Sequence, residues 1–247
     1  MPKTTSAYIG AAVMRLMNVL TRVRLVFLVC LLMLLASCEF YRLAEIPIAD
    51  SSGLPIIMSS SFSDPEDPNW RFSGGEKTWG KYDAWIGEGY LHLLTSPGTD
   101  GSTGCMQVAT SPDFSATDYS VAFDMKHSSG PLGVTCALKV IELGSLRYAL
   151  MVNGQTLSLY KQFADGSSDC LLQQMPADGL RAEGEWNRLE LQVSENHVQI
   201  HVNGTLEYQL QDDDPPRGNG MAVYFMPCSS SGGTVEVLVD NFTLRGE

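Results

Sequence analysis

Residues 184–205, GEWNRLELQVSENHVQIHVNGT, decide the fold. Apolar and polar residues alternate in two adjacent runs, and a short polar turn, SEN, separates the runs. Period-two alternation is typical of a half-buried strand, so the stretch predicts an antiparallel hairpin. Asn203-Gly204 tolerates the positive φ of a further turn into TLEYQLQ. The residues expected to face the core are Leu189, Leu191, Val193, Val198, Ile200 and Val202.

The Trp-Asn-Arg-Leu entry, the hairpin and the Asn-Gly turn together resemble the concanavalin A-like lectin/glucanase superfamily, which includes laminin-G-like domains. The resemblance implies an all-β fold, a jelly-roll sandwich of two antiparallel sheets. The chain after Phe62 agrees with it, because short alternating runs are separated by turn clusters such as SPGTDGSTG and DDDPPRGNG, without a helical period. Since we find no internal repeat and no second domain, residues 61–247 are expected to form one domain.

One irregularity is predicted in the last strand. Val235, Val237 and Val239 keep one apolar phase, whereas Phe242 and Leu244 follow the other. One residue must therefore be out of step near Asp240-Asn241, which is how a β-bulge appears in a sequence.

The N-terminus is expected to be a signal sequence that directs the protein out of the cytoplasm. The apolar run at residues 25–36, LVFLVCLLMLLA, follows Arg22 and Arg24. It is shorter than the ~20 residues that a membrane-spanning helix needs and fits the apolar core of a signal peptide. Leu35-Ala36-Ser37-Cys38 resembles the bacterial lipobox, which implies a signal peptide at residues 1–37 and a lipidated Cys38. An uncleaved anchor is the alternative.

The lipobox resemblance implies an extracytoplasmic lipoprotein, on the outer membrane or the cell surface, that contacts the membrane through Cys38. Residues 38–60 contain Pro47, Pro55 and a serine cluster without a sustained period, so they are expected to form a tether. The alternative is that the apolar IPI and LPII pieces of this stretch pack on the domain.

Charge excludes two classes of partner. The chain carries 16 basic and 28 acidic side chains, a formal net charge of −12. Residues 1–37 contain four of the basic groups and no acid, so the chain after them has a net charge of −16. Proteins that bind nucleic acid or dock broadly on anionic lipid need a basic surface, so neither partner is expected.

Four of the six cysteines remain once Cys30 leaves with the signal peptide and Cys38 is lipidated. Four cysteines outside the cytoplasm allow two disulfides in three connectivities, although Cys136, inside VTCALKV, also suits a small buried apolar residue. The superfamily's topology places the strands CMQVAT and GMAVYFMP in one sheet. The resemblance therefore implies a disulfide between Cys105 and Cys228.

A catalytic site is not expected. Glucanases of this superfamily carry Glu-x-Asp-x-(x)-Glu on one concave strand, so that two carboxylates work as a pair. By order along the chain the matching strand is residues 147–152, RYALMV, which has no carboxylate. A second similar group, the 3-keto-disaccharide hydrolases, shares the G-x-W-N entry, but its Asn-Ser-Gly and Gly-Tyr-Glu motifs are not matched. No metal and no cofactor are expected. His197 and His201 share a strand face without an acidic or sulfur partner. The resemblance implies, as the alternative, a structural calcium held by Asp240 together with Asp64, Glu66 and Asp67, which are otherwise turn-forming, solvated acids.

These observations predict a lipid-anchored binding module, and the resemblance to the lectin/glucanase fold implies glycan as its ligand. The binding face would lie on LGVTCALKV, RYALMVNG and TLSLYKQF, the strands that correspond to the superfamily's concave sheet. Tyr160 would stack on a sugar ring, and Arg147 and Lys139 would supply charge. The alternatives are a hydrolase of the 3-keto-disaccharide hydrolase or glucanase type and a structural or adhesion protein that binds protein.

Overall fold

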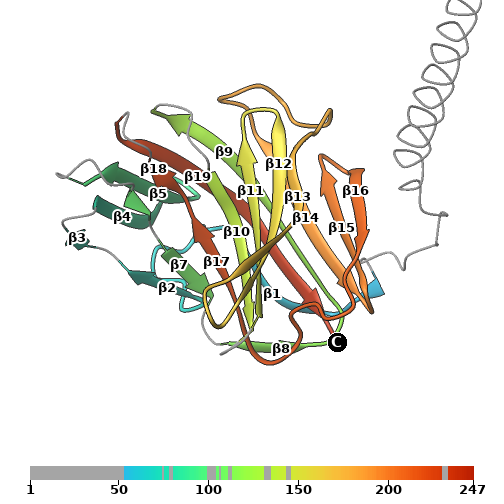
Figure 1. The fold of residues 1–247 in the computed structure, drawn as a ribbon. Helices are drawn as coiled ribbons and strands as arrows, with labels where there is room; N and C mark the ends of the chain where they lie inside the picture. Colours follow the sequence, from blue (N-terminus) through green and yellow to red (C-terminus); the bar gives the residue numbers. More distant parts are fainter. Residues whose placement is uncertain are drawn as a thin grey trace, which may run out of the picture. The chain divides into compact units, whose positions relative to one another are not determined.

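The structure, a computed structural model, describes residues 53–73, 75–77, 80–98, 104–105, 107–110, 113–130, 135–142, 146–229 and 233–247. These residues form two large antiparallel sheets that pack face to face around one apolar core (Figure 1). The predicted fold class, an all-β sandwich of two antiparallel sheets, is confirmed. Among the described residues no helix is long and apolar enough to cross a membrane.

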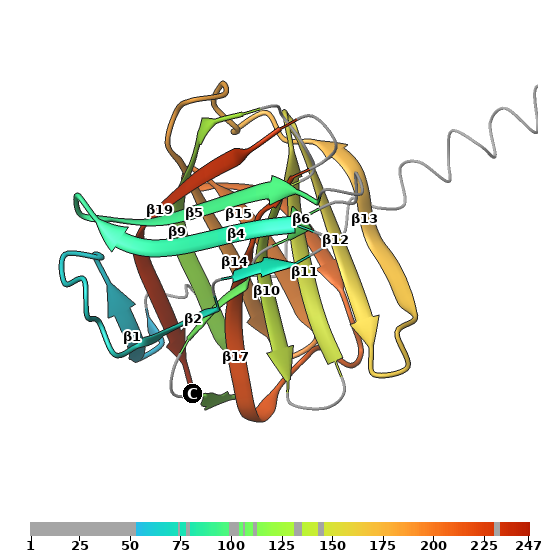
Figure 2. The ribbon, with the colours of Figure 1, turned by 90° about the vertical axis from the view of Figure 1, so that its left-hand side faces the viewer.

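The nine-stranded sheet contains the predicted hairpin and the last strand of the chain. Along its path the strands follow the order β16-β15-β14-β9-β19-β5-β4-β3, and β1 pairs with β19 beside this path. Figure 2 shows β4 and β5 side by side in this sheet. The bounds are β1 Ile56–Ser60, β3 Gly75–Lys77, β4 Gly80–Gly87, β5 Tyr90–Pro97, β9 Tyr119–Ser129, β14 Asn187–Ser194, β15 His197–Val202, β16 Thr205–Gln211 and β19 Val235–Gly246.

The eight-stranded sheet contains the strands on which the glycan-binding face was predicted. Its order is β13-β12-β11-β10-β17-β7-β2, and β8 pairs with β17 beside this path. A small third sheet joins β6 to β18. The bounds are β2 Trp70–Ser73, β6 Gly104–Cys105, β7 Gln107–Thr110, β8 Phe114–Ala116, β10 Thr135–Glu142, β11 Leu146–Asn153, β12 Thr156–Phe163, β13 Ser168–Pro176, β17 Gly218–Met226 and β18 Cys228–Ser229.

The hairpin of β14 and β15 lies where the sequence predicted it. Leu191 opposes Ile200 across the ladder, and all six predicted core residues of the hairpin are fully buried. Each such side chain contributes about 1.5–3 kcal/mol when it leaves water. Asn203 and Gly204 have φ values of 51° and 83°, as the predicted turn requires.

The core between the sheets includes a group of packed aromatic rings. The Trp70 ring centroid lies 5.2 Å from that of Phe62 and 4.9 Å from that of Phe242. Phe225 joins them and contacts Phe123 at 4.9 Å. Trp70 is therefore a buried core residue and is not available to a ligand.

The last strand has the predicted irregularity. The register of β19 against β9 shifts between Asp240 and Thr243, and Asn241 has a φ of 48°. The bulge turns Phe242 and Leu244 back toward the core, where both are buried. The alternation of the sequence therefore located the bulge correctly.

The domain begins earlier than residue 61. Residues 56–60, which were assigned to the tether, form β1 and pair with β19 from Ile56 opposite Arg245 to Ser60 opposite Phe242. Met58 is buried there, whereas Ile56 and Ile57 of the LPII piece are exposed, so this piece joins the sheet through its backbone and does not bury its isoleucines. Cys38 and the predicted signal peptide lie outside the described residues.

Candidate functional site: a row of rings and cations on the eight-stranded sheet

A row of cross-strand neighbours crosses the eight-stranded sheet on the face that points away from the core. Opposed residues of neighbouring strands share a face. Tyr160 of β12 opposes Ala149 of β11, and Ala149 opposes Lys139 of β10. Lys139 opposes Tyr224 of β17, and the row continues through Ala109 of β7 to Arg71 of β2. We call this set the Tyr160–Tyr224 row.

Alternation along each strand explains why these side chains point outward. The neighbours of Ala149 in β11, Tyr148 and Leu150, are buried in the core, and so are Leu159 and Lys161 on either side of Tyr160. In β17, the residues on either side of Tyr224 are Val223 and Phe225, which are buried as well.

Small residues form the floor of this face. Ala149 is only 2% exposed although it points away from the core, and Ala109 and Ala222 are also buried. Ser158 of β12 is buried on the same face, where its hydroxyl accepts a hydrogen bond of 2.8 Å from the backbone N–H of Gln174. Because such short side chains do not reach the surface, Tyr160 and Tyr224 stand above them on either side of Ala149 and Lys139.

The predicted site residues share this face but not one row. Tyr160 and Lys139 belong to the Tyr160–Tyr224 row. Arg147 lies two residues from Ala149 along β11, opposite Gln162 and Ile141, so it is about 7 Å from the row along the strand. All three are partly exposed. The structure thus brings them onto one surface, and their part in binding stays a prediction.

Sequence reasoning did not place Tyr224 or Arg71 on the predicted binding face. In β17 the alternating residues Met221, Val223 and Phe225 face the core, which places Tyr224 on the outward face. Because the strand is a nearly continuous apolar run, this alternation is not evident in the sequence. Arg71 could not be found from the sequence, because β7 brings it to the row. Its guanidinium donates to the Thr110 carbonyl at 2.8 Å and forms a 2.5 Å ion pair with Asp113.

Asp and Glu are missing from the described outward positions of β10, β11, β12 and β17, and the carboxylate at the end of the row, that of Asp113, is paired with Arg71. The outward positions of β11 are Arg147, Ala149 and Met151, where a glucanase would carry its acids. Acid–base cleavage of a glycosidic bond needs two carboxyl groups on either side of the bond, so this face does not offer that chemistry.

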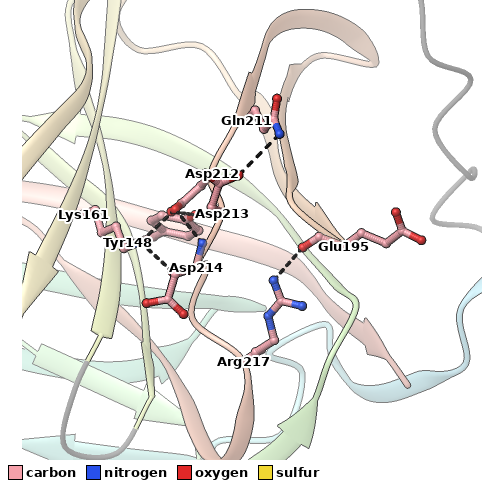
Figure 3. A network of polar contacts seen from close by, with 8 residues as sticks. All are labelled: Tyr148, Lys161, Glu195, Gln211, Asp212, Asp213, Asp214 and Arg217. Atoms are coloured by element: carbon pink, nitrogen blue, oxygen red, sulfur yellow. Dashed lines mark hydrogen bonds and ion pairs between the residues drawn. The ribbon is translucent and has the colours of Figure 1, made fainter.

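Inside the sandwich, one end of the eight-stranded sheet holds a buried ion pair (Figure 3). Lys161 Nζ lies 2.8 Å from Asp212 Oδ1 and also donates to the Asp214 carbonyl at 2.5 Å. The Tyr148 hydroxyl donates to the second carboxylate oxygen of Asp212. These contacts attach the segment after β16 to β11 and β12. Each charged or polar group is satisfied by another, so the cluster is a structural clamp rather than a site for substrate.

The pKa values of the clamp follow from these contacts. Burial alone would raise the pKa of Asp212, but hydrogen bonds from Lys161, Tyr148 and the Asp214 amide outweigh burial and lower it below its ordinary value. Burial, together with the bond to the Asp212 carboxylate, raises the pKa of Tyr148. At neutral pH the carboxylate is therefore charged and the phenol neutral.

A cavity of about 280 Å³ lies at the edge of the sandwich, and residues 180–185, the β11–β12 turn and the end of β9 surround it. Met125, Val152 and Leu180 supply apolar lining. His127 Nδ1 pairs with Glu183 at 3.0 Å, while Nε2 is buried without a hydrogen-bond partner. Because Nε2 is sealed off from the cavity's solvent, the pair does not present a base to a ligand there.

On the nine-stranded sheet, a second and more open depression surrounds Asp124. Arg188 Nη1 lies 3.3 Å from its carboxylate, and the Asn241 side chain donates to it at 2.7 Å. Asp240 is opposite Asp124 in the ladder; burial first, then the Asp124 charge, raise the pKa of Asp240. No group of three metal-binding side chains occurs within the described ranges.

The cysteines differ in their states. Cys170 is exposed on β13 with a free thiol, whereas Cys228 is disulfide-bonded. The register of β6 and β18 places Cys228 directly opposite Cys105. Cα atoms of opposed antiparallel residues lie roughly 4.5–5.5 Å apart, within the range that a disulfide spans. Cys105 as the partner of Cys228 stays a prediction.

No protein-family model matches the chain, and no curated protein matches its sequence. Solved structures show the fold. The laminarinase catalytic domain of Thermotoga maritima MSB8 has a TM-score of 0.59 at 14% identity, over 78% of this chain and 98% of that domain. The endo-β-galactosidase of Clostridium perfringens that releases GlcNAcα1-4Gal has a TM-score of 0.60 at 11% identity, over 81% of this chain and 64% of that one.

A receptor-binding domain is also similar. The botulinum neurotoxin type G receptor binding domain has a TM-score of 0.50 at 11% identity, over 78% of this chain and 48% of that chain. The described domain thus has the concanavalin A-like jelly-roll fold expected from the sequence. At these identities the similarity shows the fold alone, so the function has to be argued from the site.

Proposed function

We propose that this protein is a glycan-binding module that lipidated Cys38 holds outside the cytoplasm, and that the Tyr160–Tyr224 row is its binding site. The observation that carries the proposal is two outward tyrosines separated by Ala149 and Lys139 on one rigid sheet. Three strand spacings lie between the tyrosines, about 14 Å. The row can therefore contact more than one sugar unit of a chain.

The chemistry of the row suits a sugar. A pyranose ring has a face of C–H groups that stacks on an aromatic ring, and hydroxyl groups at its rim that accept hydrogen bonds from Lys and Tyr. Since tyrosine has few rotatable bonds and these strands are fixed in a sheet, little conformational entropy is lost on binding. The small residues of the floor leave space for a pyranose ring between the two tyrosines.

The charge of the face favours an acidic or neutral glycan over a basic one. Lys139 and Arg147 lie on the face of a chain whose net charge after residue 37 is −16. Positive charge on an otherwise acidic protein attracts an anionic ligand, and salt screens this attraction. If the ligand carries carboxylate or sulfate groups, Arg147→Ala will weaken binding mainly at low ionic strength.

A hydrolase is the second candidate, and the similar structures favour it. The T. maritima domain is the catalytic domain of a laminarinase and the C. perfringens protein is an endo-β-galactosidase, so both are enzymes that act on glycans. Against this candidate stands the outward face of β11, with Arg147, Ala149 and Met151 where paired acids would be needed. The two candidates share the sugar ligand and differ in whether products appear.

Affinity electrophoresis against a panel of neutral and acidic polysaccharides tests the proposal. We expect at least one polysaccharide to retard the wild type, and Tyr160→Ala or Tyr224→Ala to weaken binding by about tenfold or more. Phe72→Ala is the matched control, because Phe72 is an exposed ring of the same sheet at its edge, outside the row. Equal retardation of all four proteins would place the site elsewhere.

An assay for new reducing ends, run with the same panel, separates the two candidates. We expect no release of sugar from any polysaccharide that binds. Products made by the wild type and lost in Tyr160→Ala would show that the row belongs to a hydrolase. Retention of binding without products supports the binding module.

A further inference from the structure

Four rings follow one another on the outward face of the nine-stranded sheet, the sheet opposite the Tyr160–Tyr224 row. Trp85 of β4 stacks on His92 of β5, with ring centroids 4.6 Å apart and planes 10° apart. Tyr90 is in edge contact with His92, and Trp186, just before β14, is 5.3 Å from Tyr90. We call these residues the Trp85 cluster.

The indole of Trp85 is held in one orientation. His92, on which it stacks, is fixed by two hydrogen-bonding partners, the Glu236 carboxylate at Nδ1 and the Gly87 carbonyl at Nε2, each at 3.1 Å. The edge of the indole lies over Gly87, where an added Cβ would come within 3.2 Å of the ring. Gly87 thus leaves the space that the ring occupies, and the ring is ordered before any ligand arrives.

The other face of the indole is open. His92 covers the side toward β5, because Trp85 and His92 are cross-strand partners. On the other side β3 pairs only with residues 80–82 of β4, so no strand of the described chain forms a ladder with Trp85 there. The side chain accordingly remains 40% exposed. A flat aromatic face at a sheet edge is the shape on which a sugar ring stacks.

The surroundings fit a neutral sugar better than a protein. Asp83 lies two residues from Trp85 on the same side of β4, and Glu236 and Lys126 are outward neighbours across the sheet. Protein-docking surfaces have a continuous apolar centre of several hundred Å². The other large exposed apolar side chains of the described residues are on different strands: Ile56, Ile57, Phe72, Met175 and Leu206. Two carboxylates close to the ring disfavour an anionic sugar.

We propose that Trp85 is a second carbohydrate-binding platform, which takes a neutral pyranose of a polysaccharide on its open indole face. It lies on the opposite sheet from the Tyr160–Tyr224 row, so the two sites are independent. The row's cations favour acidic glycans, whereas the platform favours neutral ones. A polysaccharide with both kinds of unit would engage both sheets.

Affinity electrophoresis in gels that contain laminarin, a neutral glucan, or galactomannan tests the platform. We expect Trp85→Ala to weaken retardation by at least about tenfold and Trp85→Tyr to retain part of it. Phe72→Ala is the matched control, because Phe72 is also 40% exposed and no other ring of the described residues stacks on it. The Tyr160→Ala/Tyr224→Ala variant should still bind the neutral polysaccharide, so loss of the row and loss of the platform are distinguishable.

Three results would overturn the inference. One is that Trp85→Ala binds every neutral polysaccharide of the set as the wild type does. Another is that the wild type binds none of them. The third is that the wild type sediments as a dimer and Trp85→Ala as a monomer, because a second copy would then cover the ring. Gly87→Ala, whose Cβ requires the indole to move by a few tenths of an ångström, is expected to weaken binding less than Trp85→Ala does.

Discussion

Lys161 Nζ lies 2.8 Å from Asp212 Oδ1 between the two sheets, and both side chains are buried. A buried pair contributes little net stability, but removing one partner leaves an uncompensated charge. We therefore expect Lys161→Met to lower the free energy of unfolding by about 3–5 kcal/mol, measured by urea denaturation. Asp213→Ala, next to the clamp but exposed, should change it by less than about 0.5 kcal/mol. A Lys161→Met protein as stable as the wild type would contradict the clamp.

The clamp also predicts loss of stability in acid. The pKa of Asp212 is lower in the folded protein than in the unfolded chain. The stability that the Asp212 carboxylate contributes is therefore fully present above the unfolded-state pKa of about 3.9, and it is lost as the pH falls through the folded-state pKa. Unfolding measured from pH 7 to pH 2 should show a smaller decline in Asp212→Asn than in the wild type. Parallel curves would show that Asp212 does not couple folding to protonation.

Asp240 should behave in the opposite way. Its folded pKa is raised, so the protonated form is favoured and stability is lost as pH rises through the folded value. Asp240→Asn is therefore expected to stabilise the protein at pH 7 and to have no such effect well below pH 4. The free energy of unfolding is measured by the same urea denaturation at each pH. A lower value for Asp240→Asn than for the wild type at pH 7 would contradict this prediction.

The alternation of apolar and polar residues was enough to predict the sandwich, the hairpin of β14 and β15 and the bulge at Asp240-Asn241. These features depend on local periodicity, which burial imposes on each strand separately. The sequence also located Tyr160, Lys139 and Arg147 on one face, because the phase of a strand follows from its own residues. The limits of the tether were less accurate, since β1 is held by pairing with β19 at the other end of the chain.

Features that depend on which strands become neighbours could not be predicted. Tyr224 enters the row through the pairing of β10 with β17, about 85 residues apart, and Arg71 enters it through β7. The clamp joins Lys161 to a residue of a turn, and Trp85 meets His92 across a strand pair whose aromatic residues could equally have been core. In each case the partner is set by sheet order, which periodicity does not encode.

A disulfide between Cys105 and Cys228 would close a loop on the order of 120 residues and contribute roughly 4–5 kcal/mol in the chain-entropy model. We expect a non-reducing peptide map to link these two cysteines and to find Cys170 free. Cys228→Ser should lower the melting temperature, whereas Cys170→Ser should leave it unchanged. A map that links Cys228 to any other cysteine would show that the predicted partner is wrong.

The proposed anchor is tested by Cys38→Ser. A serine cannot form the thioether to lipid, so we expect the variant to leave the membrane fraction or to remain unprocessed. Fractionation with mass spectrometry of the mature N-terminus measures both outcomes. A Cys38→Ser protein that is processed and membrane-bound like the wild type would refute the lipoprotein hypothesis, and Cys30→Ser is the control expected to change neither.

The central claim is that the Tyr160–Tyr224 row binds glycan, and calorimetry tests it most directly. The titration uses the polysaccharide with the highest affinity, in a Trp85→Ala background that removes the second platform. We predict that adding Tyr160→Ala and Tyr224→Ala together raises the dissociation constant by about a hundredfold or abolishes the heat of binding. An unchanged dissociation constant in a variant that melts like its parent would contradict the account.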